Sequence, residues 1–305
     1  MGLSLPTVEL LFAENKYKSI EGDVGFIGRQ TTYATADSIH FLSKKYGFGQ
    51  KEGFSFELDT VTRSSNVGGG HLITDKALMN YFGSNSFSCI DVSDYEGADI
   101  ICDLSDDIPE ELHNRFDFIY DGSCLDNIFN PATALMNISR LLRPGGRVIL
   151  VNHATWFNGP YTVFSPGWFF DYFVANRYED CQVFLGIFSN TDELMYGPMQ
   201  VYFSNWFINC HGNVPEFTYR VGDSTHFAHV LLFVVAEKGK DSTNDVRPIQ
   251  MQYRDTTYNE TTFKNDAIKI MNSKRRHFSL QSDLSANREQ YGFIPLVLLG
   301  EGIPR

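Results

Sequence analysis

Apolar residues in the stretch 71–154 fall into short continuous runs that are separated by segments with helical spacing. The runs predict four buried strands, at residues 87–90, 99–102, 116–120 and 148–151. Short apolar runs that alternate with helix-length segments are typical of parallel strands joined by crossover helices. The pattern therefore predicts an α/β fold built on a largely parallel sheet.

Capping and turn residues predict where the connecting helices begin and end. Thr74 can cap a helix that continues through Phe82, and Gly83 can adopt the left-handed conformation that ends it. Asn130 and Pro131 form a cap and first-turn pair at the start of a second helix. One more helix is predicted from residue 166, and two closing strands are predicted at residues 183–188 and 229–236.

Ionisable side chains follow the predicted strands. Asp91, Asp103 and Asp121 each come directly after a strand, and His153 lies just beyond the strand at 148–151. Because ligands of open α/β sheets bind outside the carboxyl ends of the strands, these residues form a candidate site. An imidazole titrates near neutral pH and can take a proton from a hydroxyl group, which makes His153 a candidate general base. A purely structural histidine is the alternative.

Two stretches of the chain resemble a known family. The strand at 116–120 with its terminal aspartate, followed by a helix that ends in Leu-Leu-Arg-Pro-Gly-Gly at 141–146, is similar to the class I S-adenosylmethionine-dependent methyltransferases. The run Ser-Asp-Tyr-Glu-Gly-Ala at 93–98 resembles one bacterial branch of that family. The resemblance covers roughly residues 20–240. It implies a Rossmann-like sheet of seven strands with helices on both faces, and S-adenosyl-L-methionine across the carboxyl ends of the first strands.

The resemblance also implies roles for single residues. It puts Gly28 against the methionine part of the cofactor, Asp91 on the ribose hydroxyls and Asp103 near the adenine amino group. It puts Asp121 where cofactor and substrate meet. A carboxylate can accept hydrogen bonds from both ribose hydroxyls at once, which agrees with the role of Asp91. Arg29 could contact the carboxylate of the cofactor, and an ordinary surface arginine is the alternative.

The chain departs from the family pattern at two places. In the loop at 25–30, Phe26 stands where an acidic residue is usual, and Gln30 stands where a second glycine is usual. Glycines let the backbone approach a ligand closely, so the altered loop is compatible with a non-catalytic member of the fold. Relatives often carry Leu-Glu-His where this chain has Leu-Asp-Asn at 125–127. The loss of that histidine leaves His153 as the candidate base.

Changes in composition along the chain predict a main domain with an insert and a C-terminal extension. Residues 1–240 are predicted to form the methyltransferase-like domain, with an insert at about 48–72 whose Gly-rich run suits a hinge or lid. An aromatic segment at about 190–224 is interpreted as a substrate cover or a packed hairpin. Residues 241–305 form a polar C-terminal extension, of which only 293–299 is apolar enough to dock back.

Composition and charge disfavour several classes of function. Lys and Arg number 25 against 37 Asp and Glu, and the resulting net charge of −12 disfavours nucleic acid as a partner. The apolar stretches are too short to span a membrane, and the N-terminus lacks the pattern of a secretion signal. Five widely spaced cysteines predict reduced thiols and a cytoplasmic protein. Asp121, Asp126 and Asn127 could form at most a weak magnesium-type site, so no metal is expected.

The sequence therefore predicts an enzyme that moves a methyl group from S-adenosyl-L-methionine to an oxygen, or with less support a nitrogen, of a small molecule or saccharide. The predicted catalytic residues are His153 and Asp121, and the predicted cofactor-binding residues are Gly28, Arg29, Asp91, Asp103 and Asp121. The alternative is a binding or scaffold protein that keeps the fold and has lost the reaction. The oligomeric state is left open.

Overall fold

The computed structural model describes residues 2–49, 51, 53–62, 71–155, 159–204, 229–250, 260–271 and 293–305. Its strands are β1 (Gly22–Ile27), β2 (Ser84–Asp91), β3 (Ile100–Ile101), β4 (Phe116–Gly122), β5 (Leu142–His153), β6 (Asp180–Phe188), β7 (Met199–Ser204), β8 (His229–Glu237) and β9 (Phe293–Leu299). Its α-helices are α1 (Leu5–Tyr17), α2 (Ala36–Tyr46), α3 (Asp75–Phe82), α4 (Pro131–Leu141), α5 (Pro166–Ala175), α6 (Thr191–Tyr196) and α7 (Glu260–Met271).

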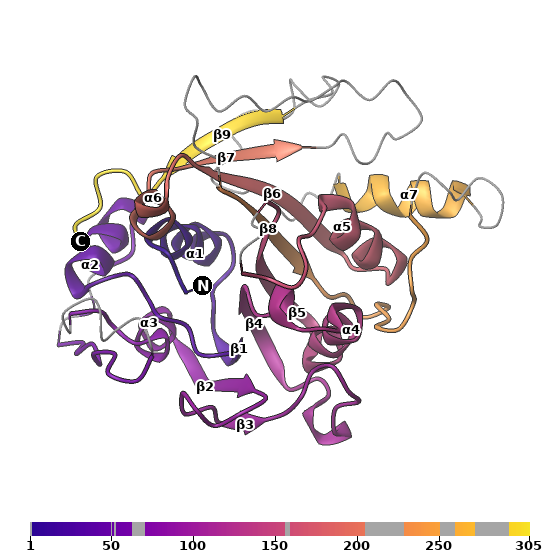
Figure 1. Ribbon diagram of the computed structural model, residues 1–305, viewed down its shortest axis with the longest axis horizontal. Helices are drawn as coiled ribbons and strands as arrows, with labels where there is room; N and C mark the ends of the chain where they lie inside the picture. Colours follow the sequence, from indigo (N-terminus) through magenta and orange to yellow (C-terminus); the bar gives the residue numbers. More distant parts are fainter. Residues whose placement is uncertain are drawn as a thin grey trace.

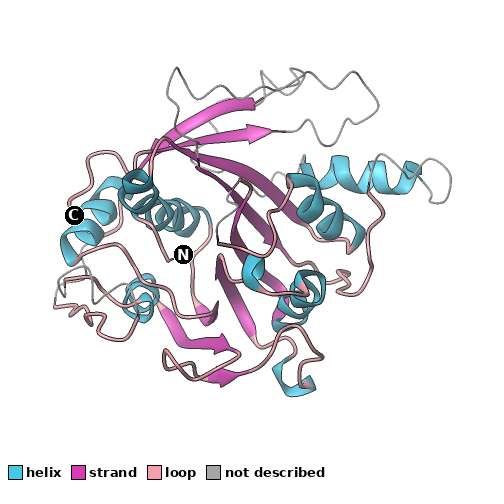
Figure 2. Cartoon of the chain, in the orientation of Figure 1, coloured by secondary structure: helices cyan, strands magenta, loops and turns pink. Residues whose placement is uncertain are grey.

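These elements form three layers around one sheet (Figure 1). The strands lie in the order β3-β2-β1-β4-β5-β8-β6-β7-β9. Helices α1, α2, α3 and α6 cover one face of the sheet, and α4, α5 and α7 cover the other (Figure 2). The arrangement confirms the predicted α/β class.

The half of the sheet from β3 to β5 is parallel throughout. Its order, 3-2-1-4-5, is that of a Rossmann-type sheet, in which the direction of the crossovers reverses between the first and fourth strands. A crevice opens at such a reversal because the chain leaves the two adjacent strand ends toward opposite faces of the sheet. The topology therefore directs attention to the carboxyl ends of β1 and β4.

The other half of the sheet corrects the expected strand count, because the described residues form a sheet of nine strands and not seven. Strands β8 and β6 continue the sheet beyond β5, and the antiparallel pair β7 and β9 extends it further. Strand β7 comes from the segment interpreted as an aromatic cover, and β9 is the apolar stretch expected to dock back. The sheet thus crosses the boundary predicted at residue 240. Residues 63–70 of the predicted lid and 205–224 of the predicted cover lie outside the described residues.

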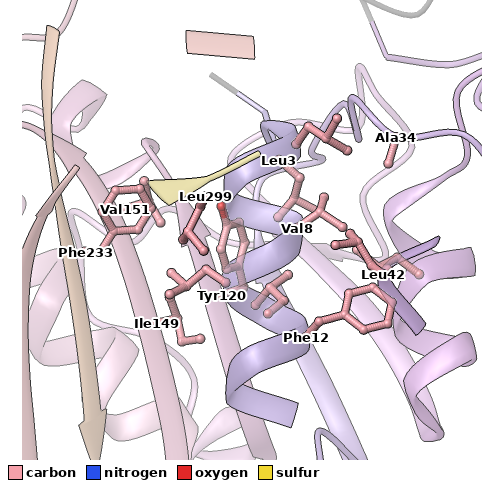
Figure 3. Packing of buried hydrophobic residues seen from close by; sticks show 14 of the residues in the cluster. Leu3, Val8, Phe12, Ala34, Leu42, Tyr120, Ile149, Val151, Phe233 and Leu299 are labelled. Carbon is pink, nitrogen blue, oxygen red and sulfur yellow. The ribbon is translucent and has the colours of Figure 1, made fainter. Parts of the chain in front are cut away.

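Each central strand sends alternate side chains into two cores. Tyr120 of β4 points toward α1, whereas the next residue back, Ile119, points toward the layer of α4 and α5. Figure 3 shows the first core, in which Tyr120 of β4 lies beside Ile149 of β5, and Val8 and Phe12 belong to α1. Strands β4 and β5 are covered on both faces, and their apolar runs at 116–120 and 148–151 were sufficient to predict them. Strand β1 was not predicted from an apolar run, and β2 begins with the polar residues 84–86.

Helix α1 is the main element that the hydrophobic pattern did not predict. Its residues 5–15 are all buried, so its sequence lacks the one-sided apolar stripe of an amphipathic helix. Two of the buried residues are acidic and are paired by other elements. Glu14 accepts from Arg147 of β5 at 3.0 Å, and Glu9 pairs with Lys45 of α2 at 2.6 Å.

The predicted start of α3 at Thr74 is confirmed by the side chain of Thr74, which accepts from Ala77 N.

Candidate active site at the carboxyl edge of the sheet

The loop after β1 brings together residues that are far apart in the chain. Gly28 has a φ of 68°, in the left-handed region that glycine adopts most easily, and its N–H donates to Ile90 O of β2 at 2.8 Å. A Cβ atom on Gly28 would lie 2.6 Å from Cys124 Sγ and 3.5 Å from Asp91 Oδ2. The loop therefore needs a glycine here, and Asp91 and Cys124 lie at its surface.

The ends of β2 and β3 carry two carboxylates that are open to solvent. Asp91 is half-buried, and its Oδ1 accepts from Ser93 N at 3.1 Å. Asp103 is exposed, and its Oδ1 accepts from Ser105 N at 2.8 Å. In both cases one carboxylate oxygen closes a local turn, and the other can still accept a hydrogen bond from a ligand.

Two exposed apolar side chains lie beside these carboxylates. Ile101 of β3 is paired in register with Asp91, and Val92 follows Asp91 directly. The exposed fractions of Val92 and Ile101 are 65% and 56%. Apolar side chains next to hydrogen-bond acceptors provide the two kinds of contact that an aromatic ring with polar edges requires.

Arg29 is engaged by a buried carboxylate. Its Nη2 donates to Asp75 Oδ1 at 2.8 Å and its Nε donates to Asp75 Oδ2 at 3.2 Å. Burial raises the pKa of Asp75, and the charge of Arg29 opposes that effect. The bidentate pair ties the loop after β1 to the first turn of α3. A contact between Arg29 and the cofactor's carboxylate stays a prediction.

Gln30 fills the space that a second loop glycine would leave open. Its side chain is 1% exposed, and its Nε2 donates to Ile27 O at 3.1 Å. It lies against the end of β4, where a Cβ atom on Gly122 would overlap Gln30 Oε1. The sequence marked Gln30 only as a departure from the family pattern. The structure shows that its amide lies at the reversal between β1 and β4.

Asp121, at the end of β4, is completely buried. Its Oδ1 accepts from Cys124 N at 2.9 Å and Leu125 N at 3.2 Å, and its Oδ2 accepts from Asn152 Nδ2 at 3.0 Å. Burial, and next the negative charge of Asp126, raise the pKa of Asp121 to about 7. The structure therefore shows Asp121 holding the turn after β4, and its predicted contact with cofactor and substrate stays a prediction.

Asp126 and His153 form a closely bonded pair beside Asp121. His153 Nδ1 lies 2.7 Å from Asp126 Oδ2, and His153 N donates to the same oxygen at 3.0 Å. Asp126 is fully buried, and its own N–H donates to Asn152 Oδ1 at 3.2 Å. A carboxylate can only accept, so this network assigns the ring proton to Nδ1 and the lone pair to Nε2.

Ser123 completes this network through an unusual backbone conformation. Its φ of 70° lies in the left-handed region, which is uncommon for a residue other than glycine. The turn directs Ser123 Oγ to both oxygens of Asp126, at 2.9 and 2.8 Å, and to His153 Nδ1 at 3.0 Å. Strained backbone of this kind often accompanies functional sites, and here it fixes three polar side chains relative to one another.

A second imidazole lies near the first. His229 begins β8, which pairs with β5, and the pKa of His229 is lowered by burial and by the nearby His153. The sequence singled out neither His229 nor Ser123 as a site residue, and Asp126 only as part of a weak metal site. Their proximity to His153 appears only when β5 lies between β4 and β8.

The described part of the chain holds no group of three or more His, Cys, Asp or Glu side chains that could bind a metal ion. The expectation that transfer needs no metal stays a prediction. None of the described helices is long and apolar enough to cross a lipid bilayer. A cavity of about 730 Å³ lies between α4 and α5, but the predicted site residues do not line it.

Comparison with known proteins finds only weak similarity to solved structures. No protein-family model matches it, and no curated protein does. Solved structures that match include a proposed Zn-dependent alcohol dehydrogenase from Rhodobacter sphaeroides, with 16% identity and a TM-score of 0.28 over 49% of this chain and 47% of that chain. The Burkholderia thailandensis 1,6-didemethyltoxoflavin-N1-methyltransferase has 12% identity and a TM-score of 0.31 over 76% of each chain.

A third match is the phosphoethanolamine N-methyltransferase 2 of Haemonchus contortus, with 11% identity and a TM-score of 0.37. It covers 76% of this chain and 52% of that one. This chain thus spans about half the length of the dehydrogenase and of the Haemonchus enzyme. At these identities and TM-scores the matches establish neither a family nor an activity.

Proposed function

We propose that this chain transfers a methyl group from S-adenosyl-L-methionine to an oxygen of a small molecule or saccharide. One observation carries the proposal: a carboxylate-held imidazole, His153, lies on the same sheet edge as Gly28 and Asp91. Strands β1 and β4 lie between β2, which ends in Asp91, and β5, which ends in His153. The edge thus combines ligand-binding groups at one end with a proton acceptor at the other.

The residues of the first three strands fit the proposed cofactor. When bound, the cofactor supplies a methyl group attached to a positively charged sulfur. The sulfur is the leaving group when the methyl group is transferred. Asp91 and Asp103 would accept hydrogen bonds from the ribose hydroxyls and the adenine amino group. Val92 and Ile101 offer apolar surface to the adenine ring. The left-handed Gly28 leaves the loop without a side chain where the methionine part is expected.

His153 would take the proton from the acceptor hydroxyl. With its proton on Nδ1 and held by Asp126, the ring presents Nε2 as the accepting nitrogen. Asp126 then stabilises the positive charge that the ring gains. Asn152 links this pair to Asp121, because it accepts from Asp126 N and donates to Asp121 Oδ2. Asp121 would act as a positioning residue in this scheme.

A binding or scaffold protein is the second candidate function. It is favoured by the loop after β1, in which the side chains of Gln30 and Cys124 occupy the space next to Gly28. A protein of this kind would keep the fold and the packed edge but would give no methyl transfer. Retention of the ordered Asp126–His153 pair favours the enzyme, because such a pair has no evident use in a scaffold.

Calorimetric titration with S-adenosylhomocysteine tests the proposed cofactor site. We expect binding by the wild-type chain and an affinity at least tenfold lower for Asp91→Ala. That loss corresponds to roughly 1.5–3 kcal/mol for each charge-assisted hydrogen bond. Asp106→Ala is the matched control, because Asp106 is an exposed carboxylate close to the same edge. The absence of heat and of a thermal shift at millimolar ligand would contradict the proposed function.

A further inference from the structure

In the side-chain amide of Gln30, the nitrogen has hydrogen-bond partners, whereas the oxygen has none among the described residues. Its Nε2 donates to Ile27 O at 3.1 Å and to Gly28 O at 3.4 Å. Both partners are carbonyl oxygens that can only accept, so the nitrogen must face them and the oxygen must face away. Oε1 is then a buried acceptor, and among the described residues it has no hydrogen-bond partner.

The position of Oε1 is specific to this chain. The oxygen lies over the end of β4, where a Cβ atom on Gly122 would overlap it, so Gly122 makes room for the glutamine. On the other side, Gln30 Nε2 lies 3.8 Å from the position of a Cβ on Gly28. The amide therefore spans the reversal between β1 and β4, where ligands of such sheets bind.

A buried acceptor without a donor destabilises the folded chain, and such groups usually belong to a site that a water or a ligand completes. The carboxyl groups in the surroundings indicate the missing donor. Asp91 approaches Gly28 from one side, and the buried Asp121 lies near the end of β4 on the other. A positively charged donor suits these surroundings.

We propose that Gln30 Oε1 accepts a hydrogen bond from the ammonium group of an α-amino acid, the amino-acid end of the bound cofactor. The inference rests on the proposed function, which puts the methionine part of S-adenosylmethionine beside Gly28. In this view Gln30 supplies an acceptor in a loop that lacks the usual acidic residue at position 26. Gln30 is then a ligand-binding residue that distinguishes the complete cofactor from adenosine compounds without an amino group.

Three ligands test this assignment on the full chain. S-adenosylhomocysteine carries the ammonium group, its desamino analogue lacks only that group, and 5′-methylthioadenosine lacks the whole amino-acid end. We expect the wild-type chain to bind the desamino analogue at least tenfold more weakly than S-adenosylhomocysteine. Equal affinity for these two ligands would overturn the assignment without any variant. Failure to bind all three would instead contradict the proposed function.

Variants of Gln30 test whether its side-chain oxygen causes this difference in affinity. Gln30→Met keeps the length of the side chain without its acceptor. We expect this variant to bind S-adenosylhomocysteine at least tenfold more weakly than the wild type and to bind 5′-methylthioadenosine with unchanged affinity. Gln30→Glu keeps an acceptor and should retain the binding of S-adenosylhomocysteine. Thr32→Val is the matched control, because Thr32 Oγ1 is also buried in this loop without a described partner. If Gln30→Met weakens both ligands equally or neither, Oε1 is satisfied by a water or only supports the fold.

Discussion

The two ends of the site edge carry the same kind of residue in opposite environments. At the ends of β2 and β3, Asp91 and Asp103 are open to solvent and each uses one oxygen in a local turn. At the ends of β4 and β5, Asp121 and Asp126 are fully buried and accept several hydrogen bonds from their neighbours. The open carboxylates are suited to binding a ligand, whereas the buried ones are suited to holding other groups in place.

The difference follows from the strands next to them. Strand β3 has only two residues and lies at the edge of the sheet, so the ends of β2 and β3 have little structure around them. Strands β4 and β5 lie in the interior of the sheet, and the turn after β4 folds back over their ends. The same sequence feature, an acidic residue after a strand, therefore has two different outcomes.

The largest expected effect concerns the buried end. His153→Ala should lower the rate of methyl transfer by about 10²–10⁴-fold while the affinity for S-adenosylhomocysteine stays nearly constant, because the variant removes a general base and no cofactor contact. The measurement is transfer of a radiolabelled methyl group to the best substrate from a panel of hydroxylated compounds and sugars. His71→Ala, at an exposed position, is the control. Full activity of His153→Ala would move proton removal to another group.

The second effect concerns the pH dependence of stability. The pKa of Asp121 is raised to about 7 in the folded chain, from an ordinary value of 3.8. The folded state therefore binds this proton more tightly, and the resulting stability is present below about pH 4 and is lost as the pH rises through about 7. The loss is on the order of 4 kcal/mol at most, at about 1.4 kcal/mol per unit.

Urea unfolding at several pH values measures this loss. Asp121→Asn cannot titrate at residue 121, so the free energy of unfolding of the wild type should fall relative to that of the variant between pH 4 and 7. The two proteins share all other titrating groups, which makes the difference between them the relevant quantity. Parallel curves would mean that Asp121 keeps an ordinary pKa despite its burial.

A smaller effect is expected at the partner of His153. Asp126→Asn removes the charge that holds the ring proton and stabilises the imidazolium, so turnover should fall by roughly ten- to a hundredfold, in line with 1.5–3 kcal/mol for a charge-assisted hydrogen bond. A merely structural role for Asp126 would lower the melting temperature without lowering the turnover of the folded protein.

The smallest effect is expected at the open end. Asp103→Asn keeps an acceptor at an exposed position, so the affinity for S-adenosylhomocysteine should change by roughly two- to tenfold, the value of one ordinary hydrogen bond. Titration calorimetry beside the Asp91→Ala variant measures the ratio. A loss at Asp103 larger than that at Asp91 would reverse the assignment of the two carboxylates.

Part of the sequence that carries the family resemblance lies outside the site. The Leu-Leu-Arg-Pro-Gly-Gly turn lies at the amino end of β5, where Arg143 pairs with Asp23 at 2.8 Å and Asp117 at 2.6 Å. The turn favours glycine at residue 146, because a Cβ atom there would lie 2.9 Å from Arg143 O and 3.0 Å from Asp117 O. The turn is thus a packing feature at the opposite edge of the sheet. It indicated the fold well for this reason, and it carries no information about the chemistry.

The sequence by itself determined the central strands β4 and β5 and the apolar part of β2, because strands in the interior of a covered sheet are apolar and their helices carry one-sided stripes and caps. It also determined that polar groups follow those strands. Only the tertiary structure decided which of them are open and which are buried, since that depends on neighbours distant in the chain. The pairing of Asp126 with His153, the closure of Gln30 over Gly122 and the complete burial of α1 arise from such neighbours. The local sequence pattern shows how residues are spaced along one element, whereas a site forms where several elements meet.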